Sequence, residues 1–278
     1  MSRVLNDEGT VRPQTRAKVE AAIQQLRYRP SAVARALATK KTGTIGLIST
    51  GNPLYGPSSI ALAFNEAARE NGYHVVTASM SRSNHDQILE AIDVLLRQQV
   101  EAIVLIAIDY SSIDAVDDVE IDVPLVTVDS SGHGGFPGAS IDQFSGASLA
   151  TGYLADLGHR RILHVAGPTE SLDARERERG WRRELMRRGL PVRAALLGDW
   201  TPESGLAAGE ELAMDRDFDA IFVSNDQMAI GLLQAFRAHG IRVPEDVSIV
   251  GFDDIPEAAY FVPPLTTIRQ DFTELGRR

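Results

Sequence analysis

The sequence of 278 residues contains no cysteine. This absence excludes disulfide bonds, thiolate metal sites and a cysteine nucleophile, and it fits a reducing compartment. No stretch approaches the ~18 consecutive apolar residues of a membrane helix. The first residues, MSRVLNDEGT, lack the apolar core of a signal peptide. Together these absences predict a cytoplasmic protein that does not enter the membrane.

Sequence motifs of catalysis are also missing. There is no Walker loop, no G-x-G-x-x-G, no H-E-x-x-H and no G-x-S-x-G, and the six histidines show no spacing that suits metal ligands. An α/β enzyme would therefore have neither a nucleophile nor a phosphate loop. We expect no catalytic residues, no metal and no cofactor.

Charge is present but unevenly distributed. The net charge is −10, yet residues 1–41 contain nine basic and three acidic side chains, which leaves +6 in that segment and −16 in the remainder. A basic head on an acidic body suggests that one module binds a polyanion such as nucleic acid. The alternative is a solvated basic helix followed by a linker.

Periodicity changes at residues 39–43, TKKTG. Before this point Val19, Ala22, Ile23 and Leu26 have helical spacing and predict a helix that begins near Pro13. Residues 31–38, SAVARALA, predict a second helix, which is too short to be stable without a partner.

After this point short apolar runs alternate with amphipathic helical stretches. The eight runs are 44–49, 73–79, 102–108, 124–129, 161–167, 194–198, 220–224 and 247–252. Such runs are typical of parallel strands with helices on both faces of the sheet. Eight strands exceed one compact unit, so we expect an α/β fold of two parallel-sheet subdomains of about four strands each. The division should fall near Asp142, with a cleft between the two, and ligands in such folds bind beyond the carboxyl ends of the strands.

Several blocks of the sequence resemble the lac-repressor/galactose-repressor (LacI/GalR-type) family of transcription regulators. They are SRVLN, VRPQTRAKVEAAIQQLRYRPSAVARALAT, TGTIGLI, YLADLGHRRILHVAGP, FVSNDQMAIGLLQAF and VPEDVSIVGFDDIPEAAYFVPPLTTIRQDFTELG, in the family's order. The spellings YGPSS, ARERERGW and GDW are most similar to the lac-repressor branch. The resemblance spans essentially the whole chain.

This resemblance implies a domain organisation. Residues 1–28 would be a partial helix-turn-helix head and 29–42 the hinge helix and linker. Residues 43–142 and 143–268 would be the two lobes of a periplasmic-binding-protein-like core, and 269–278 a segment that returns to the first lobe. It also implies that the sequence begins inside the recognition helix, at Ser2 and Arg3, and stops before the family's final helix and strand. We therefore expect a gene fragment or a wrongly assigned start.

The resemblance implies DNA contacts in the head and hinge at Arg3, Tyr28, Ser31, Ala34 and Leu37. Arg3 would reach a base edge or a phosphate, and Leu37 would be the apolar wedge that enters the minor groove. The alternatives are a solvated arginine and an ordinary core leucine.

The resemblance also implies an effector site between the lobes. Its residues would be Thr50, Leu54, Pro57, Ile60, Asp129, Arg177, Trp200, Asn225, Asp253 and Phe272. Arg177, Asn225 and Asp253 would bind sugar hydroxyls, Trp200 and Phe272 would be apolar walls, and the remaining residues would line the first lobe.

Several of these residues have a structural alternative. Asn225 could be only a helix cap, Asp253 could only brace a turn, and Trp200 could be plain core. Arg177 lies in the charged run ARERER, where a solvated helix face is the default, and only its spacing to Trp181 singles it out.

Two positions depart from the lac-repressor branch. Gly56 stands where an alanine is usual, and Asp173 stands where a serine is usual. Both changes could reshape the pocket.

The function implied is a sequence-specific DNA-binding repressor, active as a homodimer or larger homo-oligomer. Its operator affinity would be switched by a small sugar such as a galactoside. The alternative is a periplasmic-type sugar-binding protein without DNA binding. That protein would have a signal peptide and would lack a basic head. This sequence shows no signal peptide and has a basic head, so both observations go against the alternative.

Overall fold

The computed structural model describes residues 4, 11–26, 28, 41–50, 54–80, 84–117, 119, 121–129 and 135–278. The chain forms two compact units, residues 1–43 and 44–278. In the first unit, α2 (Pro13–Gln25) begins with the proline at its first position, as predicted. The side chains of Val19, Ala22 and Ile23 are half-buried. The predicted hinge helix at 31–38 lies outside the described residues.

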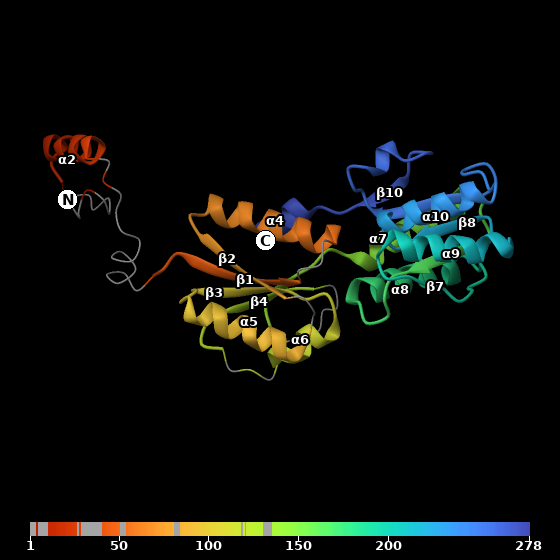
Figure 1. Ribbon diagram of the computed structural model, residues 1–278, viewed down its shortest axis with the longest axis horizontal. Helices are drawn as coiled ribbons and strands as arrows, with labels where there is room; N and C mark the ends of the chain where they lie inside the picture. The colour runs from red at the N-terminus through yellow and green to blue at the C-terminus, as the bar shows by residue number, and fades with distance from the viewer. Residues whose placement is uncertain are drawn as a thin grey trace. The chain divides into compact units, whose positions relative to one another are not determined.

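The second unit has two lobes, each built on a five-stranded parallel sheet (Figure 1). The strand orders are β2-β1-β3-β4-β5 and β10-β9-β8-β6-β7. The first sheet contains β1 (Thr44–Thr50), β2 (His74–Met80), β3 (Ala102–Ile106), β4 (Leu125–Val128) and β5 (Gly138–Ala139). The second contains β6 (Ile162–Ala166), β7 (Leu196–Leu197), β8 (Ala220–Val223), β9 (Ser248–Asp253) and β10 (Thr266–Arg269). The α/β fold with two parallel-sheet subdomains is confirmed.

The strand count differs from the prediction by one strand in each sheet. Each of the eight apolar runs contains a strand, and the additional strands are β5 and β10. Both lie at an edge of their sheet. Edge strands need no continuous apolar run, since they are covered less completely than central strands.

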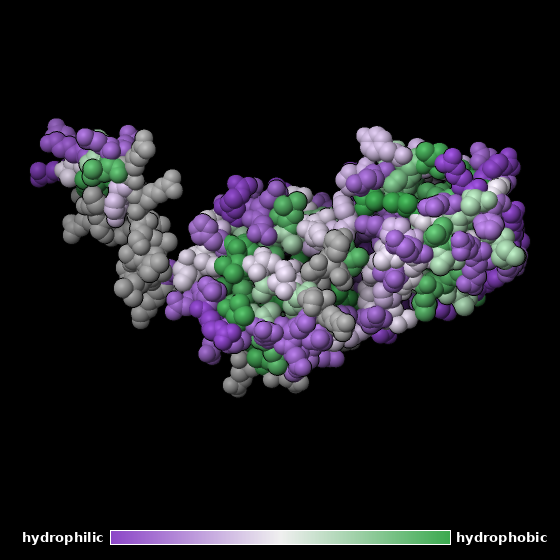
Figure 2. Space-filling model, viewed as in Figure 1, coloured by the Kyte–Doolittle hydropathy of each residue, from purple (hydrophilic) through white to green (hydrophobic). Residues whose placement is uncertain are grey.

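Helices cover both faces of each sheet. In the first lobe, α5 (His85–Arg97) and α6 (Tyr110–Asp117) pack on one face and α4 (Tyr55–Glu70) on the other. In the second lobe, α9 (Pro202–Met214) and α10 (Asp226–Ala238) pack on one face. Its other face is covered by α7 (Gln143–Asp156) and α8 (Leu172–Arg187). Hydrophilic side chains are spread over the visible surface of both lobes (Figure 2).

The chain passes between the lobes twice within the described residues. The first crossing joins β5 to α7, and the second joins β10 to α11 (Phe272–Arg277). The α11 helix packs against α4 of the first lobe (Figure 1). A Cβ atom at Gly276 would lie 2.6 Å from the carbonyl carbon of Ala63, so only glycine allows this close approach.

No helix in the described part of the chain is long and apolar enough to cross a membrane.

Candidate functional site

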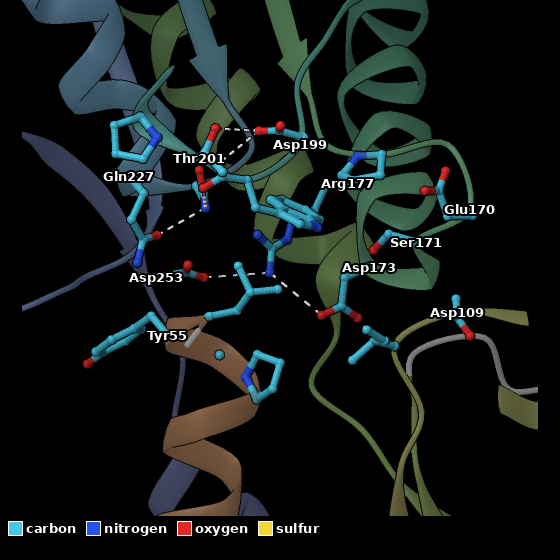
Figure 3. A pocket seen from close by; sticks show the side chains of 18 residues that line it. Tyr55, Asp109, Glu170, Ser171, Asp173, Arg177, Asp199, Thr201, Gln227 and Asp253 are labelled. Carbon is cyan, nitrogen blue, oxygen red and sulfur yellow. Dashed lines mark hydrogen bonds and ion pairs between the residues drawn. The ribbon is translucent and has the colours of Figure 1, made fainter. Parts of the chain in front are cut away.

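A cleft of about 570 Å³ opens at the carboxyl edges of the two sheets (Figure 3). The first lobe contributes the start of α4 and the residues that follow β3. The second lobe contributes residues that follow β6, β7 and β8, the end of β9, and the first turns of α8. This is the place where open α/β sheets bind ligands, as the strand pattern predicted.

Arg177 of α8 lies at the centre of the cleft wall (Figure 3). It is only 4% exposed, and its guanidinium is held by hydrogen bonds on two sides. Nε donates to Oε1 of Gln143 at 2.9 Å, and Nη1 donates to the carbonyl of Ser224. The guanidinium also lies over the ring of Phe252, 3.9 Å from its centroid, and 5.4 Å from that of Trp200. These contacts fix its orientation before any ligand binds.

Two carboxylates flank the remaining nitrogen of this guanidinium. Nη2 of Arg177 lies 3.6 Å from Oδ1 of Asp253 and 3.8 Å from Oδ2 of Asp173 (Figure 3). Asp253 is 6% exposed, whereas Asp173 is 43% exposed. One of the two carboxylates is therefore buried in the wall, and the other is open to the cleft and to solvent.

Asp253 ends β9 in an unusual environment for a carboxylate. Burial raises its pKa to about 7, although the charge of Arg177 acts in the opposite direction. Its Oδ1 accepts a hydrogen bond of 2.7 Å from Nε2 of Gln270. Its backbone φ is 114°, a value that side-chain-bearing residues rarely adopt. Such strain is concentrated at functional sites, where surrounding contacts maintain it.

Trp200 and Asn225 form a connected part of the wall. A Cβ atom at Gly167 would lie 2.5 Å from the indole, so the glycine makes room for Trp200. The side chain of Asn225 caps α10, because Oδ1 accepts from the Met228 N–H at 2.9 Å. Its Nδ2 donates to the Trp200 carbonyl at 3.0 Å. The capping role proposed for Asn225 is thus present, and the same side chain also lines the cleft.

A smaller cavity of about 40 Å³ adjoins the cleft and shares Pro57 and Asp173 with it. Ile60, Asp129 and Phe272 line this cavity. The Phe272 ring meets the Tyr55 ring edge-on at a centroid distance of 5.8 Å. The return segment that begins α11 therefore completes the first-lobe side of the site.

The structure brings nine of the ten predicted effector residues to these two cavities. Six line the cleft, namely Leu54, Pro57, Arg177, Trp200, Asn225 and Asp253, and Ile60, Asp129 and Phe272 line the smaller cavity. Thr50 ends β1, but its side chain lies outside the described residues. Their roles in binding stay predictions.

The predicted DNA contacts fall mostly outside the described residues. This applies to Arg3, Ser31, Ala34 and Leu37. Tyr28 is described and is 43% exposed. Its contact with DNA stays a prediction.

Two glutamines of the site were missed by the sequence analysis. Gln143 is the first residue of α7 and Gln270 follows β10, so each lies where the chain passes between lobes. Nε2 of Gln143 donates to Oε1 of Gln270 at 2.8 Å, and both side chains are buried. A lone glutamine beside a loop carries no periodicity, and so no pattern indicated either residue.

A serine, a histidine and an aspartate also lie together, but far from the cleft. The Ser248 Oγ is 2.8 Å from Nε2 of His159, whose Nδ1 is 3.6 Å from the Asp219 carboxylate. These residues precede or begin β9, β6 and β8, at the edge opposite the cleft. The Asp219 carboxylate also accepts the backbone N–H groups of Arg160 and Arg161. The cluster therefore connects the beginnings of three strands.

Metal ligands are not gathered at any place in the described part of the chain, since it contains no group of three His, Cys, Asp or Glu that could hold an ion.

A two-lobed core with a cleft at its strand ends, preceded by a separate helical unit, defines a ligand-binding regulator. Residues 151–278 match a periplasmic binding protein-like domain, and residues 1–31 match the lacI family of bacterial regulatory proteins. The chain is 35% identical over 279 residues to the lactose operon repressor of Escherichia coli (strain K12), covering 100% of this chain and 78% of that protein.

Solved structures give the same result. A lac repressor dimer bound to operator and the anti-inducer ONPF matches with a TM-score of 0.89 at 35% identity, covering 99% of this chain and 84% of that one. The complex of the transcriptional regulator CelR with cellobiose matches with a TM-score of 0.76 at 32% identity, covering 99% and 85%. The chain belongs to the lacI family of bacterial regulatory proteins. It is a DNA-binding transcription regulator, and the alternative without DNA binding is not favoured.

Proposed function

We propose that this regulator is a repressor whose operator affinity is switched by a small sugar bound in the cleft between its lobes. The observation that carries the proposal is the buried pair of Arg177 and Asp253, set beside the face of Trp200. The carboxylate accepts from sugar hydroxyls, the guanidinium donates to them, and an indole covers the apolar face of a sugar ring.

The two lobes supply the switch. A sugar that contacts both lobes stabilises one relative arrangement of them, and linkage then changes operator affinity by the same factor. We propose a homodimer as the DNA-binding form, by analogy with the lac repressor dimer bound to operator. Arg3, Tyr28, Ser31, Ala34 and Leu37 are its proposed DNA contacts.

The class of sugar is proposed from the resemblance to the lac-repressor branch. The YGPSS segment and Trp200 favour a galactoside, and the cellobiose complex of CelR shows that a relative of this chain takes a disaccharide. We further propose that the protein is cytoplasmic, releases its sugar chemically unchanged, and has the bounds 1–28, 29–42, 43–142, 143–268 and 269–278 for its parts.

Calorimetric titration of the full chain tests the effector. Methyl β-galactoside, methyl β-glucoside, cellobiose and ribose are the probes, and at least one should bind and be recovered intact. If none of the four probes gave a binding heat, the sugar proposal would be overturned.

A pair of arginine variants tests the site. Arg177→Lys keeps the charge but loses the planar fork, so sugar affinity should fall by roughly tenfold or more. Arg182→Lys on the same helix is the control, because Arg182 pairs with Glu178 on the exposed side. Equal affinity in the two variants would place the sugar elsewhere.

A further inference from the structure

The charge lining the cleft is strongly one-sided. Of its eighteen lining residues, all in the described part of the chain, five are carboxylates: Asp109, Glu170, Asp173, Asp199 and Asp253. Arg177 is the single cationic side chain among those eighteen. A cleft lined by one sign of charge raises the local concentration of ligands of the opposite sign and excludes those of its own.

That single cation is already engaged. Nη2 of Arg177 lies within 3.8 Å of both Asp173 and Asp253, and its other nitrogens donate to Gln143 and to the Ser224 carbonyl. A phosphate or carboxylate that approached this guanidinium from the cleft would come close to the exposed carboxylate of Asp173. Like charges brought together at a binding contact repel each other and weaken association.

Helix amino ends would otherwise favour an anion here. The α8 helix begins at the cleft with Ser171 as its cap, and the positive end of a helix dipole attracts negative charge. Asp173 lies in the first turn of α8 and supplies that negative charge from within the chain. Asp226 does the same for α10, where it is fully buried and accepts from Thr267 and the Ile255 N–H.

We propose that Asp173 makes the cleft selective for sugars without an anionic group, so that neutral and amino sugars bind while sugar phosphates and sugar acids are rejected. The proposal rests on the sugar-binding function above. Asp173 is suited to the role because it is the half-exposed carboxylate beside Arg177, whereas Asp253 is buried in the wall. Its open oxygens accept hydroxyl or ammonium hydrogens and repel a second anion.

Matched ligand series test this selectivity by calorimetry on the full chain. One series is galactose, galactosamine, galacturonic acid and galactose 6-phosphate, and the other contains the four corresponding glucose compounds. In the series whose neutral sugar binds, the amino sugar should bind at least as tightly. The acid and the phosphate should bind roughly tenfold more weakly or worse. A phosphate that binds as tightly as its neutral parent would overturn this inference while leaving the sugar-binding function intact.

Two variants assign the selectivity to one side chain. Asp173→Asn keeps the shape and removes the charge, so the ratio of 6-phosphate affinity to neutral-sugar affinity should rise about tenfold. Glu178→Gln removes the same charge from the same helix outside the cleft lining and should leave both affinities unchanged. An unchanged gap between neutral and phosphorylated sugar in Asp173→Asn would overturn the role of Asp173. If no member of either series gave a binding heat, the sugar-binding function and this inference would both be overturned.

Discussion

Replacing Asp253 by asparagine should stabilise the protein at pH 8 while it weakens sugar binding. In the folded chain burial raises the pKa of Asp253 to about 7, from an ordinary value of 3.8. The folded state therefore holds this proton at a pH where the unfolded chain has released it. Stability is lost as pH rises between about 4 and 7, and the full loss is present at pH 8.

The size of the effect follows from the two pKa values. At about 1.36 kcal/mol per pKa unit, the difference between 3.8 and about 7 corresponds to roughly 4 kcal/mol. The raised pKa already includes the attraction of Arg177. Asparagine does not ionise and still offers Gln270 an acceptor. We therefore expect Asp253→Asn to gain about 2–4 kcal/mol over the parent at pH 8 and little at pH 4.

Urea unfolding followed by circular dichroism at pH 4 and pH 8 measures the gain, and calorimetry measures sugar affinity. Asp246→Asn is the matched control. The hydrogen bonds from Arg242 lower the pKa of Asp246 to about 2, so this carboxylate is ionised at both pH values in the folded chain. A gain for Asp253→Asn that is equal at the two pH values, or a loss at pH 8, would refute the reasoning.

Three further substitutions have expected outcomes. Asn225→Ala removes the α10 cap and the hydrogen bond to the Trp200 carbonyl. The free energy of unfolding should therefore fall by about 1 kcal/mol, and sugar affinity should also fall. An unchanged urea midpoint together with an unchanged sugar affinity would contradict this expectation. Gly231→Ala would place a Cβ 1.8 Å from the Pro202 carbonyl oxygen, and the melting temperature should fall as α9 and α10 separate. Hydrogen bonds from Arg187, which has the largest effect, and from Arg188 lower the pKa of Glu184 to about 2. The ionised Glu184 therefore stabilises the folded protein above pH 4.5, and this stabilisation is lost as the pH falls towards 2. Glu184→Gln should therefore be less stable than the parent at pH 7 and equal to it near pH 2, as acid titration of the circular dichroism signal will show.

The sequence predicted the sheets well because buried parallel strands leave a strong signal. The edge strands β5 (GA) and β10 (TTIR) do not, because they contain only one large apolar side chain between them. The charged run around Arg177 indicated a solvated helix face, but the Arg177 side chain is buried. Its neighbours in ARERER form exposed ion pairs, yet Ala174, Arg177, Trp181 and Leu185 follow helical spacing and are all buried on one stripe of α8. The spacing to Trp181 therefore agrees with the buried position of Arg177.

Other features of the site could not be read from the sequence. Gln143 and Gln270 contact each other across 127 positions of the chain, and no local pattern encodes a contact of that length. The burial of the Asp253 carboxylate depends equally on elements that meet only in the folded protein. The family resemblance implied the role proposed for Asp253, but its raised pKa required the structure.

The two glutamines at the lobe crossings have a mechanical consequence. Gln143 receives a hydrogen bond from Arg177, Gln270 donates one to Asp253, and the two amides are joined to each other. A ligand that displaces either charged side chain would therefore disturb the two segments that join the lobes.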